Sequence, residues 1–314
     1  MKPKGIITCA GIFPEKYLDE VRQMSDLAEL ACSLNSKEFE EKIKEAEFYI
    51  QGGEEKNTLE VMQKAEKLKK IFFAGINYES FYEPAALEFL KKKGVHVYPT
   101  GGGQSSVARL TYDQIMLFAR TKIAREGVWP EDHATGLEKS PVVRIIGAGG
   151  IGAAVLKMLA GKTKDLGYVE VRGEVKELRE LGVKYIPDLE KAFDADIVSL
   201  HVPYIPGVTD NLITKAMLSK LRPGAVLINN ARAEIVDREG FLRFQKERPD
   251  VINLWDVLWW EGDDFRKLDA KTRQEIFQNN FFFNGHKAFM AYPELTKEEY
   301  GQGLMKLIRE HGLV

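Results

Sequence analysis

The feature that most constrains this chain is a glycine-rich hexapeptide between an apolar run and an amphipathic segment. The hexapeptide is Gly147-Ala148-Gly149-Gly150-Ile151-Gly152. The run Val142–Ile146 before it predicts a buried strand, and Ala153–Leu159 after it predicts a helix. In such a unit the glycines allow a tight turn, close approach of a pyrophosphate and close packing of helix on strand. Because a helix N-terminus also attracts phosphate groups, the segment predicts a dinucleotide-binding turn.

An acidic residue at the end of the second strand is expected to bind the ribose hydroxyls of such a nucleotide. We expect this strand at Tyr168–Arg172, with Glu170 and Glu174 as the acidic candidates. Arg172 lies between them, and a guanidinium there could pair with the 2′-phosphate of NADP. Alternatively, Glu170 and Arg172 are solvated residues on the edge of the strand. The predicted cofactor is therefore NAD or NADP, and Arg172 tilts the expectation slightly towards NADP.

Two successive series of strands and helices organise the chain. The expected strands are Gly5–Ala10, Phe48–Ile50, Lys70–Ala74 and Val95–Tyr98 in the first series, and Val142–Ile146, Tyr168–Arg172, Ile197–His201, Ala225–Asn229, Ile252–Asp256 and Phe281–Phe283 in the second. A long helix, Ser105–Arg125, separates the series, and a helix at Thr296–His311 ends the chain. This alternation is typical of α/β proteins with a mainly parallel sheet. With 314 residues, the chain is long enough for two such domains.

Composition excludes several classes of function. The net charge is −2, which does not favour a nucleic-acid or membrane-binding surface. No apolar stretch approaches the roughly 20 residues of a membrane span, and the N-terminal apolar run is too short for a signal peptide. The two cysteines, Cys9 and Cys32, are expected to be reduced thiols in the cytoplasm, with no metal site.

Several further stretches occur in the order found in one enzyme family. They are Val107-Ala108-Arg109-Leu110-Thr111, Gly127-Val128-Trp129, Ala195–Pro203, Leu221–Arg232, Trp255-Asp256-Val257, Glu261 and His286. Together with the glycine turn, they make the sequence resemble the D-isomer-specific 2-hydroxyacid dehydrogenases over roughly residues 100–290. In the first hundred residues the main match is Ala74-Gly75-Ile76-Asn77, which is similar to the family's loop for the substrate carboxylate.

The resemblance implies a fold, a reaction and an assembly. The expected fold is α/β, with two doubly wound parallel-sheet domains. A Rossmann cofactor domain, residues 104–286, is inserted into a flavodoxin-like substrate domain, residues 1–103 plus 287–314. The implied reaction is NAD(P)-dependent hydride transfer to or from a small 2-hydroxy or 2-keto acid. By the same analogy the protein is a homodimer.

The resemblance also assigns three catalytic residues, and their chemistry suits the reaction. Reduction of a 2-keto acid needs a cation that holds the carboxylate and polarises the carbonyl, and Arg232 offers a bidentate guanidinium. It also needs an acid for the carbonyl oxygen, and the imidazole of His286 titrates near pH ~6.5. Glu261 is expected to orient His286 and to favour its protonated form.

Binding residues follow by the same resemblance. The cofactor set is Gly147, Gly149, Gly150, Ile151, Gly152, Arg172, Val202, Pro203, Ala231 and Asp256, and the substrate set is Gly75, Ile76, Arg232 and His286. Asp256 is expected to contact the nicotinamide carboxamide. His201 belongs, in the family, to the turn on the cofactor side rather than to proton transfer.

Other interpretations stay open at this point. Arg232 could cap a strand, Glu261 lies in an acidic run, and His286 could be a surface residue. The sequence also departs from the family pattern: Gly262 follows Glu261 where the family has proline, and Arg109, Trp259 and Trp260 could reshape the pocket. These departures leave the acid undetermined. The alternative function is a catalytically silent, dinucleotide-sensing binding protein of the same fold, because some relatives resemble transcriptional corepressors.

Overall fold

The computed structural model of the chain describes residues 2–31, 37–53, 55–76, 78–125, 141–163, 165–260, 262–277 and 280–314. The stretch Gly127-Val128-Trp129 and the predicted catalytic Glu261 lie outside the described residues. Contacts divide the chain into one unit of Met1–Gly103 and Pro293–Val314 and another of Gln104–Tyr292. Within the described ranges, no helix has the length and apolar character needed to cross a membrane.

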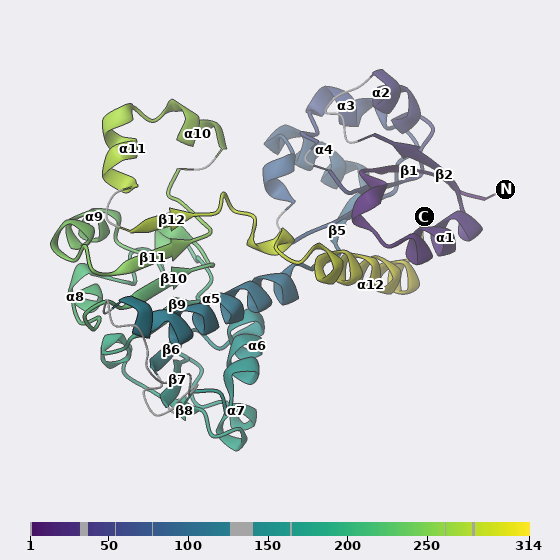
Figure 1. The fold of residues 1–314 in the computed structure, drawn as a ribbon. Helices are drawn as coiled ribbons and strands as arrows, with labels where there is room; N and C mark the ends of the chain where they lie inside the picture. Colours follow the sequence, from purple (N-terminus) through teal and green to yellow (C-terminus); the bar gives the residue numbers. More distant parts are fainter. Residues whose placement is uncertain are drawn as a thin grey trace. The chain divides into compact units, whose positions relative to one another are not determined.

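The first unit is built on a five-stranded parallel sheet with the order β2-β1-β3-β4-β5 (Figure 1). Its strands are β1 (Lys4–Thr8), β2 (Asp26–Leu30), β3 (Phe48–Gln51), β4 (Lys70–Phe73) and β5 (His96–Pro99). Its helices are α1 (Glu15–Met24), α2 (Lys37–Ile43), α3 (Leu59–Lys64), α4 (Pro84–Lys93) and α12 (Pro293–His311). The strand order is that of flavodoxin-like sheets, with the switch point between β1 and β3.

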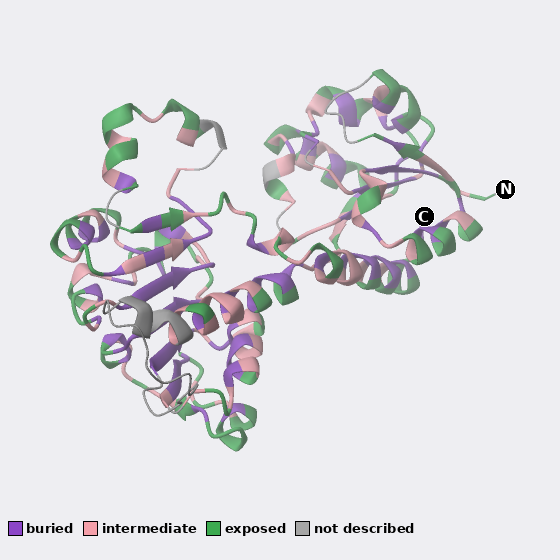
Figure 2. Ribbon diagram, in the orientation of Figure 1, coloured by how far each residue is buried: buried purple, intermediate pink, exposed green. Residues whose placement is uncertain are grey.

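Helices cover both faces of this sheet. On one face Tyr49 and Ile71 pack with α2, α3 and α4, and on the other Ile7 and Ile50 pack with α1 and α12. A parallel sheet that is covered on both faces needs strands that are apolar at nearly every position. This explains why every residue of β3 is buried, and Figure 2 shows the buried strands at the centre of the unit.

The second unit contains a seven-stranded parallel sheet with the order β12-β11-β10-β9-β6-β7-β8 (Figure 1). The strands are β6 (Val142–Ile146), β7 (Asp165–Val169), β8 (Lys184–Tyr185), β9 (Ile197–Leu200), β10 (Val226–Asn229), β11 (Ile252–Trp255) and β12 (Phe281–Phe283). The helices are α5 (Gln104–Arg125), α6 (Gly150–Leu159), α7 (Lys176–Glu180), α8 (Lys215–Leu218), α9 (Arg238–Glu247), α10 (Gly262–Lys267) and α11 (Ala270–Ile276). The chain winds from β6 to one edge and returns to β9, so the switch point lies between β6 and β9. The expected class, two doubly wound parallel sheets, is confirmed.

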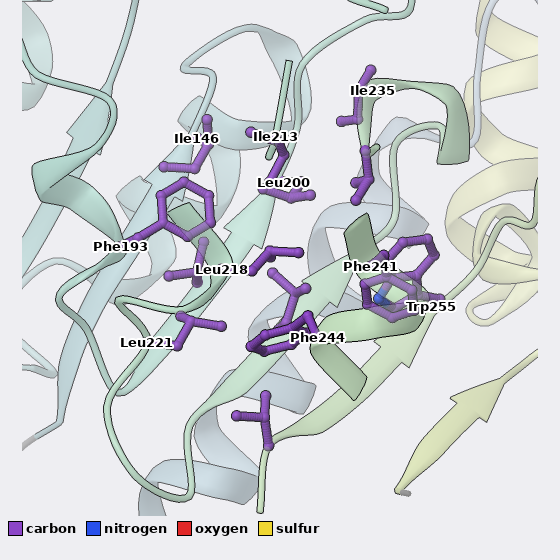
Figure 3. Close-up of a cluster of buried hydrophobic side chains, with 14 of the residues drawn as sticks. Ile146, Phe193, Leu200, Ile213, Leu218, Leu221, Ile235, Phe241, Phe244 and Trp255 are labelled. Atoms are coloured by element: carbon purple, nitrogen blue, oxygen red, sulfur yellow. The ribbon is translucent and has the colours of Figure 1, made fainter. Parts of the chain in front are cut away.

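Two cores hold the second unit together. One lies between the sheet and α5, α6 and α7. The other lies on the opposite face, and Figure 3 shows Phe241 and Phe244 of α9 close to Trp255 of β11. The ring centroids of Phe241 and Trp255 are 4.5 Å apart. Burial of a phenylalanine side chain such as Phe241 contributes about 1.5–3 kcal/mol, so this packing fixes the strand ends that carry the loops described below.

The second strand of this sheet differs from the prediction. We expected Tyr168–Arg172, whereas β7 is Asp165–Val169. The chain turns immediately after Val169, because Gly173 has φ +95° and its N–H donates to Glu170 O at 3.1 Å. Glu170 is therefore the first residue after the strand. The strands β2 and β8, which we did not predict, lie at the edges of their sheets and are less buried.

The second unit extends six residues further along the chain than we expected. Residues 287–292, expected in the first domain, belong to the second unit. The 3-10 turn Ala288–Met290 packs on the start of α5, since Ser106 Oγ donates to Ala288 O at 2.8 Å. Tyr292 N donates to the same Oγ at 2.9 Å. These bonds place the boundary after Tyr292.

The redox state of one cysteine also differs from the expectation. Cys9, which follows β1, is disulfide-bonded rather than reduced. Cys32 lies outside the described residues. A disulfide depends on how two loops approach each other, and the count of two cysteines could not show this.

Candidate functional site

The turn after β6 is packed too closely for side chains at two of its glycines. Gly147 has φ +95°, and a Cβ built on it would lie 2.8 Å from His201 O and 2.9 Å from the carbonyl carbon of His201. A Cβ on Gly152 would lie 1.9 Å from Gly147 O. Only glycine allows strand, turn and helix to approach this closely.

The middle of the same turn faces open space. A Cβ on Gly149 would meet no atom within 4 Å, and Gly149 caps α6 without a side-chain hydrogen bond. A Cβ on Gly150 would meet only the end of the flexible Gln104 side chain, at 2.7 Å. The first N–H groups of a helix lack partners within the helix, and here they begin at Gly150 and Ile151. The turn therefore offers N–H donors beside Gly149, where the chain leaves open space, an arrangement that can bind a phosphate group.

Glu170 joins the end of β7 to this turn. Its side chain is 7% exposed, and its Oε2 accepts a hydrogen bond of 3.0 Å from Ala148 N. Arg172 Nε donates to Glu170 Oε1 at 2.9 Å, and Arg172 Nη2 donates to Oε2 at 3.1 Å. The Arg172 guanidinium and the backbone N–H groups of Arg172 and Ala148 lower the pKa of Glu170 to about 2. An ionised carboxylate thus lies beside the turn.

His201 lies behind the turn, at the end of β9. Its Nε2 is 2.8 Å from Ser199 Oγ, and burial lowers the pKa of His201 to about 4. A largely neutral, half-buried imidazole in this position packs against the turn, since a Cβ on Gly147 would lie 2.8 Å from His201 O. The predicted cofactor residues Val202 and Pro203 follow it; Val202 packs on the core, and Pro203 is exposed.

Arg232 lies in the loop after β10, and Asn229 shapes this loop. Asn229 is fully buried. Its Nδ2 donates to Arg232 O at 3.0 Å, and its Oδ1 accepts from Ala231 N at 3.1 Å. Arg232 Nη1 donates to Ala231 O at 2.7 Å. A guanidinium has five N–H donors, so this half-buried side chain has others with which to bind a carboxylate.

Asp256 and His286 lie close enough to influence each other. Asp256 is 3% exposed, and its Oδ1 accepts a hydrogen bond of 2.9 Å from Ala288 N. Burial raises the pKa of Asp256, whereas this bond and the charge of His286 lower it. His286 has φ +57°, in the left-handed region that few residues other than glycine adopt. Backbone held in this region is concentrated at functional sites.

Two of the predicted catalytic residues, Arg232 and His286, and the predicted cofactor residue Asp256 lie at one edge of one sheet. Arg232, Asp256 and His286 follow β10, β11 and β12, which are neighbours in the sheet. Ligands of open parallel sheets bind at the carboxyl ends of the strands, which is also where the glycine turn lies.

Two predicted substrate residues belong to the first unit, in the loop after β4. Gly75 has φ +147°, and its N–H donates to Thr100 Oγ1 at 3.3 Å. Ile76 is 50% exposed. The position of Glu261 lies outside the described residues, so its predicted contact with His286 stays a prediction.

Sequence reasoning missed residues that support the predicted ones. Glu170 was only one of two acidic candidates, and its bond to Ala148 became visible only in the structure. Asn229 and Asn230 were not predicted; Asn230 Nδ2 donates to Thr111 Oγ1 at 2.8 Å, which ties the Arg232 loop to α5. Two adjacent asparagines at the end of a buried strand were the available signal.

A cavity of about 370 Å³ lies on the loops that follow β9, β10 and β11. It is lined by Tyr204, Asp210, Asn211, Glu234, Asp237, Arg238, Glu239 and Trp259. Four carboxylates against one guanidinium disfavour a phosphate there, in contrast to the glycine turn. In the residues that the structure describes, no cluster of three or more histidine, cysteine, aspartate or glutamate side chains could hold a metal ion.

Comparisons with known proteins identify the family that the chain resembles. The profile of the family described as D-isomer specific 2-hydroxyacid dehydrogenase, NAD binding domain, matches residues 115–286. The chain is 32% identical over 242 residues to D-3-phosphoglycerate dehydrogenase of Methanocaldococcus jannaschii, covering 74% of this chain and 44% of that relative. It therefore spans less than half the length of that protein. It is 29% identical over 262 residues to glyoxylate reductase of Korarchaeum cryptofilum, covering 79% of this chain and 76% of the relative.

Solved structures share the fold. The NAD complex of the D-isomer specific 2-hydroxyacid dehydrogenase from Lactobacillus delbrueckii ssp. bulgaricus matches with a TM-score of 0.72 at 18% identity. The match covers 98% of each chain. At this identity the likeness concerns the fold alone.

Proposed function

The chain belongs to the D-isomer specific 2-hydroxyacid dehydrogenase family, and on that premise we propose that it is an NAD(P)-dependent oxidoreductase acting on a small D-2-hydroxy or 2-keto acid. The observation that carries the proposal is the placement of Arg232, Asp256 and His286 after three neighbouring strands, at the same edge as the glycine turn. The family relatives named above include a reductase and a dehydrogenase of such acids, as their names state.

The proposed roles follow from the chemistry of the side chains. Bound nicotinamide supplies or accepts the hydride. Arg232 holds the substrate carboxylate and polarises the C2 carbonyl, because a guanidinium binds a carboxylate through two parallel hydrogen bonds. His286 gives its proton to the carbonyl oxygen during reduction and takes it back during oxidation. Glu261 orients His286, and Asp256 positions the nicotinamide end of the cofactor beside it.

The choice between NAD and NADP depends on the surroundings of Arg172. From the sequence, Arg172 slightly favoured NADP. In the structure Arg172 is paired with Glu170, a carboxylate that is ionised and fixed to the turn through Ala148. An anion at the end of the second strand accepts hydrogen bonds from the ribose hydroxyls and repels a 2′-phosphate. We therefore propose NAD as the better cofactor.

Three further expectations are retained as parts of this proposal. Gly75 and Ile76 take part in binding the substrate carboxylate. The protein acts as a homodimer and is located in the cytoplasm. These parts rest on the resemblance to the family.

A panel of 2-keto acids, assayed with NADH and NADPH side by side, tests the proposal. Glyoxylate, hydroxypyruvate and pyruvate are the first substrates to try, and loss of nicotinamide absorbance is the readout. Arg232→Ala is expected to lower kcat/KM strongly while NADH still binds. The matched control is Arg243→Ala on α9, an exposed arginine whose change should leave kcat/KM unaltered. Tight NADH binding without turnover on the whole panel would instead support the silent, dinucleotide-sensing protein.

A further inference from the structure

The carboxylate of Glu170 accepts four hydrogen bonds within the chain. One comes from Ala148 N at 3.0 Å. The other three come from Arg172: its N–H at 3.2 Å, its Nε at 2.9 Å and its Nη2 at 3.1 Å. An ionised carboxylate has about four lone-pair sites. Its capacity to accept hydrogen bonds is therefore filled before any cofactor arrives.

The two partners of this ion pair differ in how easily they move. Glu170 is 7% exposed and is held by the turn, whereas the side chain of Arg172 is 71% exposed. Arg172 lies in the turn that Gly173 closes, next to Val171, which is 98% exposed. The exposed guanidinium of Arg172 is hydrated, and holding its long side chain in one geometry costs side-chain entropy, so water and regained freedom offset part of the loss when it leaves the carboxylate. Arg172 can thus leave the carboxylate, and Glu170 cannot.

From this asymmetry we infer that Arg172 is a specificity-determining residue that competes with the cofactor ribose for Glu170. The inference rests on the proposed function, in which Glu170 receives the ribose hydroxyls. NAD(H) must displace the Arg172 side chain before its 2′- and 3′-hydroxyls reach the carboxylate. The competition therefore weakens NAD(H) binding relative to a chain without Arg172.

The same pair has the opposite effect on NADP(H). While Arg172 stays on Glu170, the two charges offset each other, and the remaining N–H donors of the guanidinium are available to a 2′-phosphate. Without Arg172, the bare carboxylate repels that phosphate. Arg172 therefore reduces the difference in affinity between NAD(H) and NADP(H). This explains how an arginine can lie next to an acidic ribose site.

Equilibrium titration of the full chain with NADH and with NADPH, followed by nicotinamide fluorescence, tests this inference. In Arg172→Gln, the Kd for NADH is expected to fall about two- to fivefold, because the ribose hydroxyls no longer have to displace the exposed guanidinium. The Kd for NADPH is expected to rise about tenfold, because a charge-assisted contact is lost. Arg172→Lys keeps the charge without the bidentate fork and is expected to give intermediate values for both cofactors.

A matched control separates this effect from a general change in charge. Arg179 lies near Arg172 in the sequence, and its Nη1 pairs with Glu174 Oε2 at 3.2 Å rather than with Glu170. Arg179→Gln should leave both Kd values unaltered. If the unmodified chain binds both cofactors and NADH binds no tighter to Arg172→Gln, the competition is refuted and the proposed function stands. If the unmodified chain binds neither cofactor, the proposed function itself is refuted.

Discussion

The backbone N–H of Ala148 donates a 3.0 Å hydrogen bond to Glu170 Oε2, so one buried carboxylate joins the glycine turn to the end of β7. In the sequence Ala148 precedes α6 and Glu170 follows it, and their contact depends on the tight turn after β6. The shape of the phosphate-binding turn and the charge at the ribose position are therefore coupled. A change at Glu170 should affect both.

Replacement of Glu170 can separate these two effects. Glu170→Ala removes the acceptor of Ala148 N and should lower both the thermal midpoint and the affinity for NADH. Glu170→Gln keeps an acceptor for Ala148 N but loses the ion pair with Arg172, so it should recover only part of the midpoint while NADH binding stays about tenfold weaker. Thermal melts and NADH titrations of the two variants check this. Equal NADH affinity in Glu170→Gln and the unmodified chain would contradict a role for the charge.

The carboxylate of Glu170 should also make the thermal stability of the protein fall at low pH. The pKa of Glu170 falls from 4.5 to about 2 on folding, chiefly through Arg172. A depressed pKa means that the stabilisation is complete above pH 4.5 and is lost as the pH falls through about 2. The difference in midpoint between the unmodified chain and Glu170→Gln should shrink over this window. Thermal melts at a series of acidic pH values measure the difference, and a constant gap would contradict the assignment.

Two glycines of the turn provide a matched pair of substitutions. Gly147→Ala forces a side chain into backbone at φ +95° and within 2.8 Å of His201 O, so it should cost about 1–3 kcal/mol of stability. Gly149→Ala meets no atom within 4 Å, so the free protein should melt normally. Its methyl group nevertheless enters the space assigned to the pyrophosphate. We expect Gly149→Ala to lose NADH affinity without losing stability; normal NADH binding by this variant would refute that assignment.

The sequence predicted the parts of the fold that local patterns determine. The ranges of β6 and β12 were predicted correctly, because each is a short apolar run bounded by turn residues. The strand β7 was misplaced by three residues, since it begins at Asp165 and contains Gly167, whereas the run we assigned to it enters the turn at Glu170. Short strands at sheet edges, such as Asp26–Leu30, do not alternate polar and apolar residues clearly enough to be predicted as strands.

The candidate site residues that the sequence named belong to motifs. Arg232, Asp256 and His286 were named from their order in the chain, and the structure places them after neighbouring strands. The contacts of Glu170 and Asn229 depend on how distant loops approach each other. Spacing along a sequence does not contain that information.

Asn229 positions Arg232 through the backbone, and its removal should affect catalysis more than cofactor binding. Asn229→Ala leaves Ala231 N and Arg232 O without their partner, which should cost about 1–3 kcal/mol of stability. Displacement of the guanidinium should lower kcat/KM for the keto acid about 10- to 100-fold, while the Kd for NADH changes little.

A second buried asparagine provides the control for this variant. Asn253 on β11 is also fully buried, but its Nδ2 donates to Val251 O at 3.4 Å, away from the Arg232 loop. Asn253→Ala should destabilise the protein and leave kcat/KM nearly unaltered. An equal loss of kcat/KM in the two variants would show that general destabilisation, and not the position of Arg232, causes the effect.

A buried carboxyl group in the first unit should make its stability fall at higher pH. Glu55 is 3% exposed, and in the described structure its Oε1 has no hydrogen-bond partner. Burial raises the pKa of Glu55 above 4.5, so folding favours the protonated form. Its stabilising contribution is complete below pH 4.5 and is lost as the pH rises through the folded pKa.

Glu55→Gln, which stays neutral, should therefore gain in thermal midpoint over the unmodified chain as the pH rises. Exposed Glu88 provides the control, since Glu88→Gln should show no such trend, and a midpoint difference for Glu55→Gln that is independent of pH would contradict the titration.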